Sequence, residues 1–186
     1  MTDTIRCFVL INVTAWFNSN HNTRGQRIRV ALEILGPIFV KFGQVLSTRP
    51  DLLPDDIVTE LAKLQDQVPA FPNEQARAII EKSYQQSIAV MFKQFSTEPL
   101  ASASVAQVYA ATLPDDKDVI VKIIRPGIEK NIRRDIKLLY LLAKLMKLLW
   151  RDAKRLHPIA IVKEFSTIIH DELDMQREAA NASKLK

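Results

Sequence analysis

Residues 101–124, ASASVAQVYAATLPDDKDVIVKII, are the stretch that decides the fold of this chain. The stretch holds two β-rich runs, at 105–112 and 118–124, with Pro-Asp-Asp at 114–116 between them. Proline presets φ for a turn and aspartate hydrogen-bonds the nearby backbone, so this tripeptide favours a tight connection. The stretch therefore predicts an antiparallel hairpin, and we expect a further strand before Ala101.

Helical periodicity surrounds this hairpin on both sides. Upstream, apolar residues recur at helical spacing over 25–93, with breaks at prolines. Downstream, two long helices are expected at 128–154 and 158–185, separated by His157-Pro158. The expected upstream helices begin at Gly25, at Asp55 (ending at Gln67), at Asn73 as an N-cap, and at Ile88, and Pro37 either kinks the first of them or starts a new helix at Ile38.

The order of these elements predicts an α+β fold, in which a helical N-terminal extension precedes a small antiparallel sheet and long helices. We assign no structure to residues 1–24, the helical extension to 25–93, and the sheet-containing lobe to 94–186. The chain has only four glycines against nine prolines, which favours long helices over a turn-rich β protein.

The composition is that of an ordinary globular protein with a basic excess. Of the 186 residues 47% are hydrophobic and 25% are charged, and the net charge is +5. A basic balance favours anionic partners such as nucleotide phosphates, acidic lipid or nucleic acid. We set nucleic acid aside, because the sequence has no recognised motif for it and no basic patch interleaved with aromatic residues.

No apolar run reaches the roughly 20 residues that span a bilayer. The single cysteine, Cys7, fits a reducing compartment.

Two motifs in the hairpin indicate a nucleotide site. The loop at 101–108 has the spacing of the protein-kinase glycine-rich loop, G-x-G-x-x-G-x-V, with alanine at each glycine position. The run V-I-V-K, ending at Lys122, has the form of the kinase V-A-I-K strand, whose lysine pairs with the α- and β-phosphates. The alternative is a surface hairpin with small residues and an exposed lysine, but the two motifs together favour nucleotide binding. The expected nucleotide-binding residues are Ala101, Ser102, Ala103, Ser104, Val105, Ala106, Val108 and Lys122.

Alanine in place of glycine changes what this loop can do. In a glycine loop the backbone N–H groups approach the phosphates closely, and glycine tolerates positive φ. A Cβ disfavours left-handed conformations. We therefore expect the alanine loop to be stiffer than a glycine loop and to hold the phosphates differently.

A kinase-like lobe also needs a helix carboxylate that holds the lysine. The run at 171–178, DELDMQRE, offers candidates. Asp174 and Glu178 are four residues apart and share a helix face, whereas Glu172 lies well round the helix. The alternative for this run is a solvated acidic stripe.

From about residue 27 onward the chain resembles the UbiB family of atypical protein-kinase-like proteins, which is linked to ubiquinone biosynthesis. The most specific element is Lys41-Phe42-Gly43-Gln44 within GPIFVKFGQVLSTRPDLLP, which is similar to the family's K-x-G-Q motif. The segments PLASASVAQVYAA, VIVKIIRPGI and DELDMQREAANA resemble the family's alanine-rich loop, lysine strand and E-x-D helix. The four motifs occur in the family's order.

The resemblance implies a role for each motif. Lys122 would contact the phosphates and Glu178 would hold it, while Glu172 and Asp174 would form the E-x-D pair. The K-x-G-Q residues would lie across the nucleotide pocket, with the lysine near that acidic pair and the glycine allowing close helix packing against another backbone. From the residues alone, a packed helix with one snorkelling lysine is the alternative. The expected catalytic residues are Lys122, Glu178, Lys41, Gln44, Glu172 and Asp174.

The resemblance also implies an ATP-binding protein that hydrolyses ATP or phosphorylates a small molecule or lipid, in support of ubiquinone biosynthesis. Phosphorylation of a protein is disfavoured, because the K-x-G-Q helices would cover the site of a protein substrate. The alternative is a non-catalytic scaffold that recruits biosynthetic enzymes or lipid at a membrane. The kinase catalytic loop and the D-F-G aspartate, which hold Mg²⁺, do not occur in these residues. We therefore expect an incomplete fragment that is inactive alone.

The expected partners follow from the same resemblance: ATP or ADP, a lipid or ubiquinone precursor, and ubiquinone-biosynthesis enzymes. The expected location is the cytoplasmic face of the inner membrane, with a transmembrane anchor in a full-length family member. The helix expected at 128–154 carries a basic stripe on an apolar body, which is typical of a helix lying on an anionic bilayer. We favour the alternative, a buried helix with one solvated face. The stripe consists of Lys130, Arg133, Lys137, Lys144, Lys147, Arg151 and Lys154.

Overall fold

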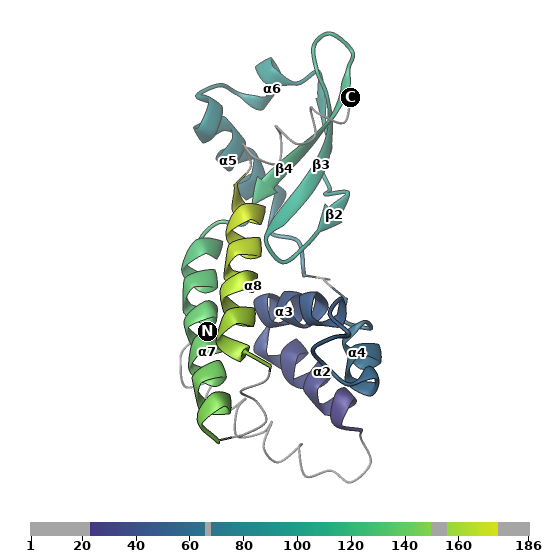
Figure 1. The fold of residues 1–186 in the computed structure, drawn as a ribbon. Coiled ribbons are helices and arrows are strands. Elements are labelled where there is room, and N and C mark those ends of the chain that lie inside the picture. The colour runs from purple at the N-terminus through teal and green to yellow at the C-terminus, as the bar shows by residue number, and fades with distance from the viewer. Residues whose placement is uncertain (1–22, 66–67, 150–155, 175–186) are drawn as a thin grey trace. The chain divides into compact units, whose positions relative to one another are not determined.

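The computed structural model describes residues 23–65, 68–149 and 156–174, whose course is drawn in Figure 1. The chain divides into two compact units. Among the described residues, the first unit takes 23–65, 149 and 156–157, and the second takes 68–148 and 158–174.

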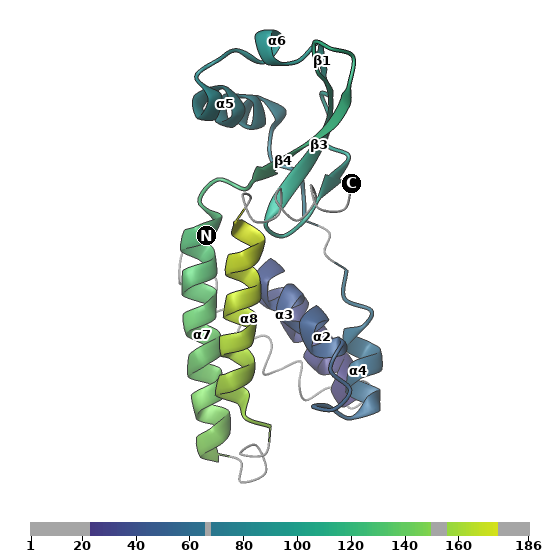
Figure 2. The same ribbon diagram turned by 45° about the horizontal axis from the view of Figure 1, so that its top comes forward.

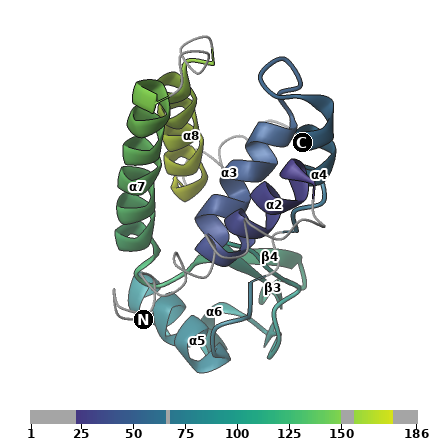
Figure 3. The same cartoon turned by 90° about the horizontal axis from the view of Figure 1, so that it is seen from below.

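The first unit contains three helices among its described residues, α2 (Arg24–Leu35), α3 (Pro37–Ser47) and α4 (Asp55–Leu61), drawn in purple and blue in Figure 3. Gly36 separates the first two helices with a φ of 114°, a conformation that favours glycine, and proline follows at the first position of α3. The three helices pack on a buried core that consists of Val40, Ile57, Leu61 and Leu64.

The second unit contains, in its described part, a four-stranded antiparallel sheet centred on β3 (Ala106–Thr112). Strand β4 (Asp118–Ile124) pairs with β3 along its whole length. The short strands β1 (Gln94–Phe95) and β2 (Ala101–Ser102) pair with opposite ends of β3. Since β4 occupies one edge of β3, both short strands lie along the other edge.

Helices pack on this sheet and follow it. The short pair α5 (Asn73–Tyr84) and α6 (Ile88–Met91) precedes the sheet and packs against one of its faces. The long pair α7 (Ile128–Leu149) and α8 (Pro158–Leu173) follows β4, and the two helices lie side by side in Figures 1, 2 and 3.

One buried cluster of the second unit lies between the sheet and α5 and α6. Tyr109 is fully buried there, and Phe95 stacks on it with ring centroids 5.2 Å apart. Each large apolar side chain that is buried contributes about 1.5–3 kcal/mol. One face of the sheet therefore stabilises the fold by forming this core. The buried cluster consists of Ala76, Ile80, Ile88, Tyr109 and Ile123.

The predicted α+β class is confirmed, and so is the predicted hairpin. Asp116, in the connecting turn, has a φ of 63°, which aspartate tolerates better than most residues. The expected strand before Ala101 is β1, and β2 begins at Ala101 itself. Local turn chemistry and strand alternation were sufficient to find these elements.

Two helix ends and one helix cap differ from the expectations. Helix α4 ends at Leu61 rather than at residue 67, because the following backbone continues in turns instead of α-helical bonds. Asn73 does not cap α5: Pro72 precedes the helix, and the Asn73 amide donates to the backbone carbonyls of Ser96 and Thr97. Helix α8 ends at Leu173, and the part of the expected helix from 175 onward lies outside the described residues.

The division into units also places α5 and α6 with the sheet. The division predicted from the sequence, a helical extension over 25–93 and a sheet-containing lobe over 94–186, stays a prediction.

Candidate nucleotide-binding face

The register of the sheet brings three of the expected site residues into one row. Ala101 of β2 lies opposite Val108 of β3, and Val108 lies opposite Lys122 of β4. Directly opposed residues of paired strands point to the same face, with Cβ atoms about 4.5–5.5 Å apart. The alanine-rich turn and the lysine strand therefore present their side chains on a common face of the sheet.

This face is opposite to the one that forms the core. Tyr109 and Ile123 directly follow Val108 and Lys122 along their strands and point into the core with α5 and α6. Successive residues of a strand alternate between faces. The row that contains Lys122, which is half-buried, is thus held on a rigid sheet without being part of its hydrophobic core.

The alanine-rich turn between β2 and β3 is compact. The Ala103 N–H donates to the Ala106 carbonyl at 2.9 Å and closes the turn. Ser104 and Val105 within it are each 1% exposed. Among the described residues, positive φ outside glycine occurs at Gln85, Asp116 and His157, and so not in this turn. The alanines form the turn without the left-handed conformations that glycine would allow.

Arg125 is a residue of this site that the sequence analysis missed. It follows β4 directly, and its guanidinium donates to the Ala103 carbonyl at 2.8 Å and to the Ser102 hydroxyl at 2.6 Å. The same group donates to the Pro69 carbonyl at 3.0 Å. An arginine next to Pro126-Gly127 was the signal in the sequence, and apart from the Ser102 hydroxyl the partners named here are backbone carbonyls that no motif identifies.

The expected acidic residues are only partly described. Glu172 lies in the last turn of α8 and Asp174 follows that helix, with both side chains half-buried. The Asp174 N–H donates to the Asp171 carbonyl at 3.2 Å. This end of α8 lies toward the end of β4 in Figures 1 and 2. Glu178, the expected partner of the lysine, lies outside the described residues.

The K-x-G-Q residues lie on α3 of the first unit. The Gln44 side-chain amide donates to the Leu64 carbonyl at 3.1 Å and ties α3 to the turn after α4. A Cβ on Gly43 would meet Leu32 Cδ1 at 2.7 Å, and Leu64 still closer. The expected close approach at Gly43 is therefore made to leucine side chains rather than to another backbone. The expected place of Lys41 and Gln44 across the nucleotide pocket stays a prediction.

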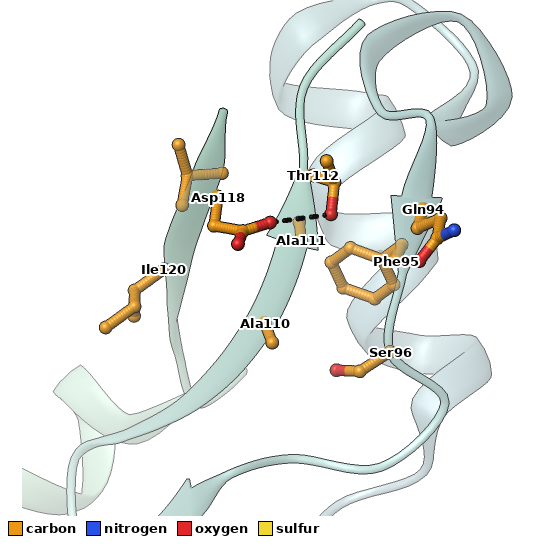
Figure 4. Close-up of a pocket in the computed structure, with 9 residues that line it drawn as sticks. Gln94, Phe95, Ser96, Ala110, Ala111, Thr112, Asp118 and Ile120 are labelled. Carbon is orange, nitrogen blue, oxygen red and sulfur yellow. Dashed lines mark hydrogen bonds between the residues drawn. The ribbon is translucent and has the colours of Figure 1, made fainter. Parts of the chain in front are cut away.

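A shallow hollow of about 630 Å³ lies on the outer part of the hairpin, beside β1 (Figure 4). Ala110, Thr112 and Ile120 line it, and the Thr112 hydroxyl donates to Asp118 at 3.0 Å. Strand alternation puts Ile120 on the same face as Lys122, two residues away. Ile120 is 71% exposed, so an apolar surface continues outward from the lysine.

Within the described residues, no group of three or more His, Cys, Asp or Glu side chains is arranged to hold a metal ion. Within the same residues, none of the helices combines the length and apolar character that crossing a bilayer requires.

This arrangement is that of the small lobe of protein-kinase-like proteins. Such a lobe has a small antiparallel sheet with a small-residue turn, a lysine on the following strand, and helices after the sheet. Residues 63–186 match the family model described as the ABC1 atypical kinase-like domain. The chain therefore belongs to the ABC1 atypical kinase-like family. The resemblance found in the sequence motifs is confirmed.

Relatives described as "Probable protein kinase UbiB" are similar over most of the chain. The relative from Marinobacter nauticus is 56% identical over 182 residues, which cover 98% of this chain and 33% of that protein. Those from Pseudomonas paraeruginosa and Cellvibrio japonicus are each 56% identical over 164 residues, which cover 88% of this chain and 31% and 30% of those proteins. The chain thus spans about a third of the length of the curated relatives it matches.

Proposed function

We propose that this chain is the nucleotide-binding lobe of an ATP-dependent atypical kinase that supports ubiquinone biosynthesis. The observation that carries the proposal is the row in which Ala101, Val108 and Lys122 share the sheet face opposite the core. A polyphosphate needs a cation and backbone N–H groups on the same side of a rigid support. The row supplies the cation beside the turn that supplies the N–H groups.

The residues of this face fit ATP. Lys122 would act as a point charge toward the α- and β-phosphates, and Val108 and Ile120 offer apolar contact to a base. Glu178 would hold the lysine in place. Bound ATP supplies the phosphoryl group. Mg²⁺ belongs to the catalytic-loop asparagine and metal aspartate of kinases, and those motifs do not occur in these 186 residues.

The acceptor that we propose is water or a small molecule or lipid rather than a protein. This part of the proposal rests on the K-x-G-Q motif of α3, Lys41 to Gln44, because the family resemblance implies that this motif disfavours a protein acceptor. The names of the relatives describe probable protein kinases. Phosphorylation of a protein by the complete protein, with no dependence on Lys41, would contradict this choice of acceptor.

Nucleotide binding is tested by calorimetric titration of the chain with ATP and with ADP. We expect binding in the wild type and at least a ten-fold loss of affinity in Lys122→Ala. Lys130→Ala is the matched control, because it removes the same charge from an exposed position on α7. Equal affinities in the two variants would contradict the proposal.

Hydrolysis of ATP is tested separately from ATP binding. We propose that the chain alone hydrolyses no ATP, because residues that would hold Mg²⁺ and the catalytic base are not among its motifs. The measurement is phosphate release with and without Mg²⁺. Mg²⁺-dependent release that Lys122→Ala abolishes would show that the chain is catalytically complete.

A second candidate function, recruitment to an anionic membrane at the cytoplasmic face of the inner membrane, is favoured by α7. Its buried stripe packs inward, but Leu141, Leu145 and Leu148 are exposed, the last by 80%. Exposed lysines lie between these leucines, and an apolar surface with basic neighbours binds anionic lipid. A scaffold that recruits lipid or biosynthetic enzymes would use this surface without needing ATP.

Vesicle flotation distinguishes this candidate from the first. We expect the chain to float with vesicles that contain anionic lipid and not with neutral ones, and the double variant Lys144→Glu/Lys147→Glu to lose this difference. No difference between the two vesicle types for the wild type would remove the membrane proposal and leave nucleotide binding untouched.

A further inference from the structure

Arg125 joins two segments that are far apart in the sequence. Its guanidinium donates to the Ala103 carbonyl and the Ser102 hydroxyl in the alanine-rich turn. The same Nη2 group that donates to the Ser102 hydroxyl also donates to the Val68 and Pro69 carbonyls, at 3.4 and 3.0 Å. The turn is thereby fastened to the chain that enters the second unit.

Further contacts support the hydrogen bonds that Arg125 makes to these two segments. The Ser102 hydroxyl donates to the Val68 carbonyl at 2.7 Å, which adds a direct link between the two segments. The Arg125 backbone N–H donates to the Val105 carbonyl at 2.9 Å, so that main chain and side chain of one residue hold both ends of the turn. The guanidinium also lies 5.7 Å from the centroid of the Phe71 ring, within range of a cation–π contact.

The geometry requires an arginine. A planar guanidinium presents five N–H donors in fixed directions and no acceptor, and so can serve several carbonyls at once. A lysine at this position keeps the charge, but its ammonium is a compact point on a flexible stem that does not reproduce the fork.

A turn built from alanines depends more on hydrogen bonds from outside the turn than one built from glycines does. Glycine loops reach phosphates through conformations that alanine disfavours. This turn uses none of them, so its shape depends on what holds its carbonyls and hydroxyls. The Ala103–Ala106 bond closes it from inside, and Arg125 closes it from outside.

We propose that Arg125 is a positioning residue that locks the alanine-rich turn into its phosphate-binding shape by clamping it to the Val68–Pro69 segment. The inference rests on the proposed nucleotide function. Lys122 lies near the end of β4 and Arg125 directly follows that strand, so the proposed phosphate cation and the clamp are three residues apart. The clamp fixes the distance between that cation and the turn.

The first readout is amide hydrogen exchange in the full chain without nucleotide. In Arg125→Lys we expect the amides of 103–106 to exchange at least ten-fold faster than in the wild type, with the core amides of β3 unchanged. The milder variant Ser102→Ala, which removes one partner of the clamp, changes the same amides by a smaller factor and covers the case in which Arg125→Lys fails to fold. Arg24→Ala is the matched control, because Arg24 also makes two side-chain hydrogen bonds, to Asp56 at the surface of the first unit.

The second readout is ATP affinity. We expect Arg125→Lys to lose at least ten-fold in affinity although the charge is kept, whereas a direct phosphate contact by Arg125 would leave most of the affinity. Unchanged exchange of 103–106, or full affinity in Arg125→Lys, would overturn the proposal. Accelerated exchange in a chain whose wild type binds no nucleotide would keep the clamp and reject the proposed function instead.

Discussion

In the first unit, Gly43 and Gln44 lie inside the packing that joins three helices, whereas in the second unit Lys122 lies on a sheet face that the core does not use. Both sets of residues belong to family motifs, yet their structural settings differ. Substitution in the first setting disturbs packing, and substitution in the second changes chemistry while the fold remains. The contrast separates motif residues that shape the protein from motif residues that we propose contact a ligand.

The sharpest form of this contrast is found in two adjacent residues of β3. Tyr109→Ala removes a fully buried ring and should lower the free energy of unfolding by about 3–5 kcal/mol. Val108→Ala on the other face should lower it by much less while weakening ATP binding. Chemical denaturation of both variants measures the difference. Similar losses of stability at the two positions would break the distinction between the faces.

The glycine of the K-x-G-Q motif is expected to show the next largest effect. Gly43→Ala places a Cβ 2.7 Å from Leu32 Cδ1, and overpacking of a core costs about 1–3 kcal/mol. Thermal unfolding should show a lower midpoint, whereas the increment that saturating ATP adds to the midpoint should remain. If the variant is as stable as the wild type, the leucines of this core move aside without a loss of stability.

Acidification should loosen the first unit before the second. The hydrogen bond from Lys63, assisted by Arg29, holds the pKa of the buried Glu60 carboxyl below its ordinary value. A lowered folded-state pKa stabilises the fold above the unfolded-state pKa, and this contribution is lost as the pH falls through the folded-state value. Hydrogen exchange followed from pH 6 downward should therefore show α2 and α4 opening first.

The matched variant for the acid response is Glu60→Gln, which cannot ionise. It should be less stable than the wild type near neutral pH and should show a smaller change on acidification. If the wild type and Glu60→Gln respond to pH identically, the carboxylate is not the group that links the first unit to pH.

The smallest effect is expected at Gln107 on the core face of β3. Its side chain is fully buried, and neither its amide oxygen nor its amide nitrogen has a hydrogen-bond partner among the described residues. Replacing such a group by an apolar one of similar shape is nearly neutral or stabilising. Gln107→Leu should leave the free energy of unfolding within about 1 kcal/mol of the wild type. A clear loss of stability would show that the amide has a partner, such as a buried water.

The sequence predicted the hairpin and the lysine strand correctly because their signals are local. Turn residues at 114–116 and strand alternation around them act over a few residues. The shared row of Ala101, Val108 and Lys122 also follows from strand pairing once the turn is fixed. These three motif residues could thus be placed on one face from strand pairing alone.

The features that sequence reasoning missed depend on distant backbone atoms. Asn73 looked like a helix cap, but carbonyls at 96 and 97 bind its amide instead. Arg125 and Gln44 likewise bind carbonyls of residues 20 or more positions away. Every residue has a backbone carbonyl. The pattern of side chains in a sequence therefore does not indicate which carbonyls will lie near a given donor.

The most direct test of the account is a methyl NMR titration of the chain with ATP. The account predicts that the methyl signals of Ala101 and Val108 shift as ATP is added, that those of Ile123 on the core face do not, and that Lys122→Ala abolishes the shifts. Shifts centred on Ile123 and α5, or the same shifts in Lys122→Ala, would contradict it.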